Sequence, residues 1–122
     1  MVFAVLVAGT CLFHLAIVAG APWGRLTMGG RWPGALPMPA RVLPVLSALL
    51  LIWAARVVLA AAGLIAGPVA GWAAWLVLAI LVVAVLANAT TPSAPERRLW
   101  LPVTLAMLAS GGAVLVPALM AG

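Results

Sequence analysis

Four long apolar runs constrain the fold of this chain more than any other feature. They cover residues 2–20, 43–64, 70–88 and 99–119, and each approaches the ~20 residues that a helix needs to cross a bilayer. Because 68% of the 122 residues are hydrophobic and 6% are charged, a soluble domain could not bury this much apolar surface. The sequence therefore predicts an all-α membrane protein, with four transmembrane helices in an antiparallel bundle that forms one domain over residues 1–122.

Two other interpretations of the apolar runs are not favoured by the sequence. A transmembrane β-barrel needs ~10-residue segments of alternating polarity, whereas these runs are apolar on every face, as spanning helices are. A cleavable signal peptide carries positive charge ahead of its apolar core, but here Met1 leads directly into the first run. We therefore expect the first run to remain in the protein as a helix.

The arginines predict how the bundle is oriented. Five of the six basic residues lie in two gaps, residues 21–42 and 89–98, whereas the gap at residues 65–69 holds none. Cytoplasmic loops of membrane proteins hold the excess of basic residues. We therefore expect both charged gaps in the cytoplasm and both termini on the other side, in the inner membrane of a bacterial host. The net charge is +5, but the chain has no basic helix face of the kind found in nucleic-acid-binding proteins. We therefore expect the basic residues to contact anionic lipid headgroups.

The gap at residues 21–42 is the most unusual segment. Its prolines exclude a continuous helix, and Trp23 and Trp32 favour a position at the membrane interface. We interpret it as an interfacial or re-entrant cytoplasmic loop. The alternative is an anion site, in which glycine N–H groups lie beside an arginine, although no phosphate-binding motif is present. The candidate lipid or partner contacts in this loop are three arginines, Arg25, Arg31 and Arg41.

Arg56 is the strongest functional candidate inside a run. A charged residue within a span costs about 3 kcal/mol on insertion scales and usually faces protein or water. Trp53 lies three residues earlier on the same helix face, where its indole could shield the guanidinium. The possible partners of Arg56 are carbonyls, hydroxyls, the Gly122 carboxylate, a lipid phosphate or another protein. The alternative is that Arg56 snorkels to the interface.

Three polar residues lie at one depth on three different runs. His14, Ser47 and Thr104 each fall about 8 to 10 Å inside the cytoplasmic boundary, at 1.5 Å rise per residue. We expect them to meet in the bundle interior. They form either a proton-handling or ligand-binding cluster around a titratable histidine, or an interhelical hydrogen bond of about 0.6 kcal/mol that only positions the helices.

The second charged gap ends in a helix-start signal. Ser93-Ala94-Pro95-Glu96 matches a capping box, in which the serine caps the last helix and Glu96 returns to the serine backbone N–H. This pattern predicts structural capping roles for Ser93 and Glu96 without catalysis. Arg97 and Arg98 follow and can meet headgroup phosphates.

The chain resembles a group of small uncharacterised bacterial four-span inner-membrane proteins. The resemblance rests on Pro-Trp-Gly, Gly-Gly and Leu-Pro elements at residues 22–24, 29–30 and 36–37, followed by Arg41. It extends to a histidine in the first span and to a series in the last gap, namely Asn88, Ser93, Glu96, Arg97, Trp100 and Pro102. The similarity covers nearly the whole chain and implies the same four-span fold, but no activity.

No enzyme signature accompanies these features. The single cysteine and single histidine are too few ligands for a metal site, and no cofactor motif is present, so we predict a protein that is not an enzyme. The leading hypothesis is an accessory or scaffolding subunit that contacts lipid or a larger membrane complex. The alternatives are a small homo-oligomeric transporter and, last, a membrane enzyme that acts on lipid with His14 as base.

Overall fold

Helices fill the apolar runs in a computed structural model that describes residues 1–121. Within these residues the α-helices are α1 (Val2–Val18), α2 (Val42–Ala61), α3 (Gly71–Thr90) and α4 (Ala94–Ala121). Three short 3-10 turns lie between α1 and α2: η1 (Gly24–Leu26), η2 (Met28–Gly30) and η3 (Met38–Arg41). By length and composition α2, α3 and α4 can each cross a membrane, and α1 is a shorter apolar helix of 17 residues. The all-α class is confirmed, and the helices are compatible with a membrane bundle.

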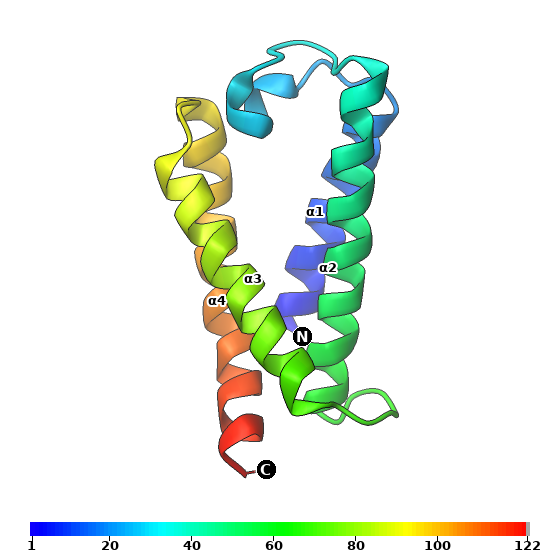
Figure 1. Cartoon of the computed structure of the whole chain (residues 1–122), viewed down its shortest axis with the longest axis vertical. Coiled ribbons are helices and arrows are strands. Elements are labelled where there is room, and N and C mark those ends of the chain that lie inside the picture. Colours follow the sequence, from blue (N-terminus) through cyan, green and yellow to red (C-terminus); the bar gives the residue numbers. More distant parts are fainter. Residues whose placement is uncertain (122) are drawn as a thin grey trace.

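The four helices form two pairs. α1 packs mainly on α2, and α3 packs mainly on α4. Figure 1 shows that the pairs approach each other at the end where both chain termini lie and diverge towards the other end. The segment at residues 19–41 bridges the pairs there, so we call this the loop end of the bundle.

The main core lies away from the loop end, where all four helices meet. Gly111 of α4 lies so close to α1 that a Cβ there would stand 3.1 Å from the Phe3 ring. The absent side chain therefore lets the two helices approach. The core comprises Phe3, Val7, Ala54, Val57, Val58, Ala73, Ala74, Val77, Leu81, Met107 and Leu115.

A second apolar cluster holds the loop on α1. Leu36 is buried with Ile17 and Ala40, and the rings of Phe13 and Trp32 pack around them. Three hydrogen bonds then fix the other side of the loop to the start of α4. They run from Gly29 N–H to Glu96 Oε2 (2.8 Å), from Trp100 Nε1 to the Leu26 carbonyl (2.7 Å), and from Ser93 Oγ to the Arg25 carbonyl. The loop is thus a structured cover over the bundle, while its interfacial position stays a prediction.

Candidate functional site

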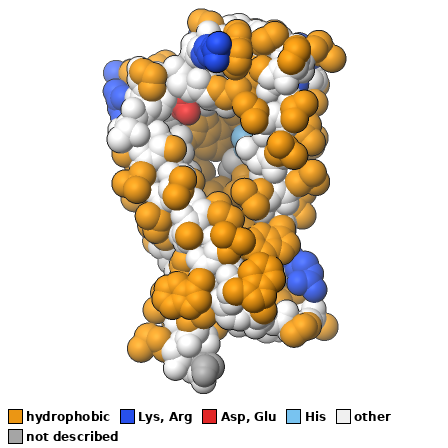
Figure 2. Space-filling view, in the orientation of Figure 1, with side chains coloured by type: hydrophobic (Ala, Val, Ile, Leu, Met, Phe, Trp, Pro, Cys, Tyr) orange, Lys and Arg blue, Asp and Glu red, His pale blue; other side chains and the backbone are white. Residues whose placement is uncertain are grey.

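A cavity of about 320 Å³ lies between the two helix pairs, in the half of the bundle nearest the loop end. All four helices and the loop contribute side chains to it, because the pairs diverge there. The cavity lies between the main core, which contributes Leu81 and Met107, and the loop cluster, which contributes Phe13. Figure 2 shows its opening as a hollow between α2 and α3, with an acidic and a histidine side chain at the rim.

The predicted polar layer meets in this cavity. His14, Ser47 and Thr104, from three different helices, all line it. They do not hydrogen-bond to one another within the described residues, since the Thr104 hydroxyl donates to the Trp100 carbonyl of its own helix at 2.8 Å. The three residues therefore line one cavity, whereas the interhelical hydrogen bond offered as a structural explanation is not found among the described residues.

His14 is the most unusual group of the cavity wall. Its Nδ1 atom is buried and has no hydrogen-bond partner among the described residues. The ring contacts Phe13 edge-on, with centroids 5.8 Å apart. A buried polar atom without a partner is destabilising by about 1 to 3 kcal/mol, so such an atom beside a cavity points to a ligand or to water.

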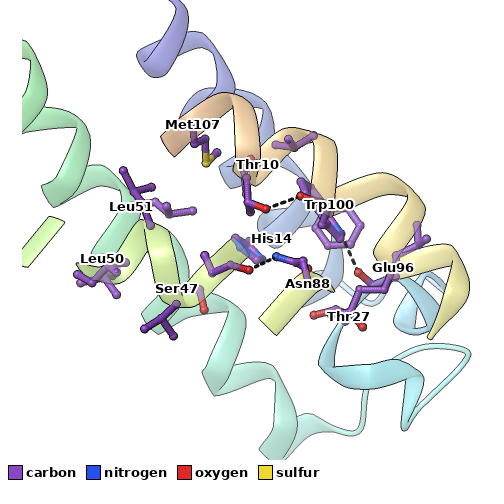
Figure 3. A pocket seen from close by; sticks show the side chains of 18 residues that line it. Thr10, His14, Thr27, Ser47, Leu50, Leu51, Asn88, Glu96, Trp100 and Met107 are labelled. Carbon is purple, nitrogen blue, oxygen red and sulfur yellow. Dashed lines mark hydrogen bonds between the residues drawn. The ribbon is translucent and has the colours of Figure 1, made fainter. Parts of the chain in front are cut away.

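Asn88 and Glu96 face His14 from the other helix pair (Figure 3). The Asn88 amide donates to the Ala84 carbonyl one turn earlier, at 2.8 Å, which directs its Oδ1 atom away from that bond. Glu96 Oε2 accepts from Gly29 N–H at 2.8 Å and from the Thr91 hydroxyl at 3.0 Å. In the part of the chain that the structure describes, the Glu96 carboxylate has no arginine partner.

The predicted capping box is half correct. Ser93 Oγ accepts from the Glu96 N–H at 3.3 Å, so Ser93 caps α4 as predicted. Glu96 does not return to the serine N–H, which donates to the Thr91 hydroxyl instead. The physical reason is tertiary, because Gly29 of the docked loop offers Glu96 a backbone donor that the local sequence does not contain.

The three loop arginines have different environments. Arg25 and Arg31 are exposed, and the Arg31 guanidinium lies 4.8 Å from the centroid of the Trp32 ring. Arg41 is partly buried and donates to the carbonyls of Leu36 at 2.9 Å and Val18 at 3.3 Å. Arg41 therefore ties the C-terminus of α1 to the loop, whereas the other two remain available to a partner.

Arg56 and Trp53 lie at the opposite end of the bundle from these arginines. Trp53 stacks on Trp72 of α3, with ring centroids 6.2 Å apart. The Arg56 side chain is exposed and extends towards the α2–α3 connection, because a Cβ at Gly67 would stand 3.1 Å from its guanidinium. This position supports the snorkelling interpretation, and the Gly122 carboxylate lies outside the described residues.

Sequence reasoning missed Asn88 and Trp100 as parts of one site. Asn88 is the only asparagine in the chain, and it lies at the end of an apolar run, on the side that holds His14. A lone polar amide at the end of an apolar run was the feature of the sequence that could have indicated this site. Trp100 lines the cavity and also binds the loop through its indole N–H, a contact that depends on the tertiary fold.

A scan against protein-family models and searches of curated proteins and of solved structures gave no match to this chain. The resemblance to small bacterial four-span proteins therefore stays a prediction.

Proposed function

We propose that the protein is a non-enzymatic accessory subunit of a bacterial inner membrane, with its loop end in the cytoplasm. There it binds anionic lipid headgroups and presents a fixed surface to a larger membrane complex. Both termini then lie on the non-cytoplasmic side. The proposal accounts for the apolar outer face of the helices and for the basic residues at one end.

The docked loop carries this proposal. Its three hydrogen bonds to the start of α4 hold it in one conformation, while Arg25, Arg31 and Trp23 remain exposed on it. Arg98 of α4 is exposed at the same end. A basic and aromatic surface held rigidly at a helix end suits phosphate headgroups, each basic residue contributing about 1 kcal/mol near an anionic membrane.

Native mass spectrometry of the protein released from its own membrane tests the proposal. We expect the wild type to carry bound phosphatidylglycerol or a partner subunit, and the double variant Arg25→Gln, Arg31→Gln to lose the lipid. Arg56→Gln is the matched control, because it removes an equally exposed arginine at the opposite end. A lone, lipid-free wild-type monomer would contradict the proposal, as would equal loss of lipid in both variants.

A small homo-oligomeric transporter is the second candidate, and the cavity favours it. A transporter needs an internal site between helix pairs, and here His14 and Glu96 line a cavity between the two pairs. Release of a homodimer without partners would favour this candidate. Unchanged drug susceptibility on deletion and on overexpression would argue against it.

A further inference from the structure

The cavity has an apolar part and a polar part. Leu51, Leu81 and Met107 line the part nearest the main core, whereas Asn88 and Glu96 line the part nearest the loop end. Glu96 and Met107 are eleven residues apart on α4, which is about 17 Å at 1.5 Å per residue. The cavity therefore extends over about half of a ~30 Å hydrocarbon core. This shape and polarity fit an amphiphile with its head towards the loop end.

The hollow between α2 and α3 gives such a molecule a lateral entrance. Leu50 of α2 and Val83 of α3 line the cavity and are also exposed on the outer surface. In a membrane these two side chains contact lipid, so the acyl chain of a bound amphiphile stays in an apolar environment as it enters. Figure 2 shows the hollow on this face.

The polar groups select the charge of the head. Within residues 1–121, none of the arginines lines the cavity, and Glu96 is its one charged residue. The second oxygen of Glu96 and the Oδ1 atom of Asn88 are free acceptors for a ligand. The unpartnered Nδ1 atom of His14 donates or accepts according to the tautomer of the ring. Ser47 adds a hydroxyl that serves as donor or acceptor. A phosphate or carboxylate head would be repelled by the Glu96 carboxylate and would bring further acceptors. An ammonium head carries the opposite charge and brings three donors for these acceptors.

Two aromatic rings strengthen this selection. Phe13 and Trp100 both line the cavity and pack edge to face, with centroids 4.8 Å apart. The indole N–H of Trp100 already donates to the Leu26 carbonyl, so the ring offers the cavity no free donor. Aromatic faces attract cations and do not attract anions.

We propose that this cavity binds one single-chain amphiphile with a primary-ammonium head. The head lies between Glu96, Asn88 and His14, and the chain extends between Leu51 and Met107 towards the main core. This site is separate from the proposed headgroup contacts of the loop arginines, which lie outside the cavity and select the opposite charge.

Native mass spectrometry in neutral maltoside detergent tests the site, with dodecylamine, dodecanol and dodecyl phosphate as probes of equal chain length. We expect the wild type to bind one dodecylamine and to prefer it to the other two probes. Glu96→Gln should weaken dodecylamine binding about tenfold or more and abolish the preference over dodecanol, because the charge is lost. The glutamine oxygen still accepts from Gly29 N–H, so the loop stays docked.

A pair of alanine substitutions on α3 tests the location without altering charge. Ala84 lines the cavity, so Ala84→Leu fills it and should abolish binding. Ala79→Leu is the matched control, because Ala79 is exposed on the same helix outside the cavity, and it should bind like the wild type. Equal binding by the two leucine variants, or no wild-type preference for the amine, would overturn the proposal. It would leave the proposed headgroup binding intact, because that depends on Arg25 and Arg31.

Adding lysophosphatidylethanolamine, a single-chain lipid with a primary-ammonium head, identifies the natural source of that head. Displacement of dodecylamine by this lipid would point to a membrane lipid, and unaltered binding would point to a free alkylamine. Both results support the ammonium site. Displacement by lysophosphatidylglycerol to the same extent would overturn it, because the site would then not select charge.

Discussion

The carboxylate of Glu96 accepts a hydrogen bond from the backbone N–H of Gly29 at 2.8 Å, across 67 residues of sequence. This bond joins the loop to the first turn of α4 at the edge of the cavity. Gly29 has a φ of +68°, in the left-handed region that glycine adopts without strain. One acidic residue thus serves both the fold of the loop end and the charge of the cavity.

Removal of this acceptor should loosen the loop. We expect Glu96→Ala to lower the unfolding free energy in mixed micelles by about 1 to 3 kcal/mol, because the N–H of Gly29 loses its partner. Glu96→Gln should lower it by less, since it keeps an acceptor oxygen. Equal destabilisation by the two variants would mean that charge, and not the hydrogen bond, holds the loop.

Gly24 should tolerate no side chain. A Cβ there would stand 1.6 Å from the Trp32 carbonyl oxygen, and a backbone atom cannot rotate away. We expect Gly24→Ala to lower the unfolding free energy by about 3 kcal/mol, the upper range for overpacking. Gly34→Ala in the same loop meets nothing within 4 Å and should change stability by less than about 0.5 kcal/mol. Similar values for both variants would contradict the loop conformation.

Arg41 should be structural, in contrast to Arg31. Because its guanidinium donates to the carbonyls of Leu36 and Val18, Arg41→Gln should lower the unfolding free energy by about 1 to 3 kcal/mol. Arg31→Gln should leave stability within about 0.5 kcal/mol of the wild type, because its side chain is exposed. Lipid retention in native mass spectra should fall for Arg31→Gln. The reverse pattern would show that the two roles were assigned wrongly.

The close packing of α1 on α4 predicts opposite effects for adjacent glycines. Gly112→Ala meets nothing within 4 Å, so it should stabilise the protein by up to about 1 kcal/mol through helix propensity. Gly111→Ala places a methyl group 3.1 Å from the Phe3 ring and should be destabilising despite the same propensity gain. Unfolding in mixed micelles compares the two, and equal stabilisation would mean that α1 does not approach α4 at Gly111.

The sequence predicted the features that depend on local pattern. Apolar runs of bilayer length became the helices, and the serine at the start of α4 caps it as the local motif indicates. Depth along the helices also placed His14, Ser47 and Thr104 around one cavity, because antiparallel helices of similar length align equal depths.

The remaining features depend on contacts between distant segments. Arg41 looked like a lipid contact because nothing local distinguishes it from Arg31, yet its partner Val18 lies 23 residues away. Trp53 looked like a shield for Arg56 from helix spacing, but the packing of α2 on α3 gave it Trp72 instead. The cavity forms because the two helix pairs diverge towards the loop end. The angle between the pairs cannot be predicted from composition.

His14 offers a final prediction, in which stability and binding respond differently to one substitution. Its Nδ1 atom is buried without a partner, so His14→Leu removes an unfavourable polar burial. We expect the unfolding free energy in mixed micelles to be unchanged or about 1 kcal/mol higher, while dodecylamine binding falls. Ser110→Ala is the control, since Ser110 does not line the cavity and its hydroxyl donates to carbonyls of its own helix, so its loss should alter neither property strongly. A destabilised His14→Leu variant with normal binding would make the histidine structural. Unchanged or higher stability together with weaker binding would show that His14 serves the ligand and not the stability of the fold.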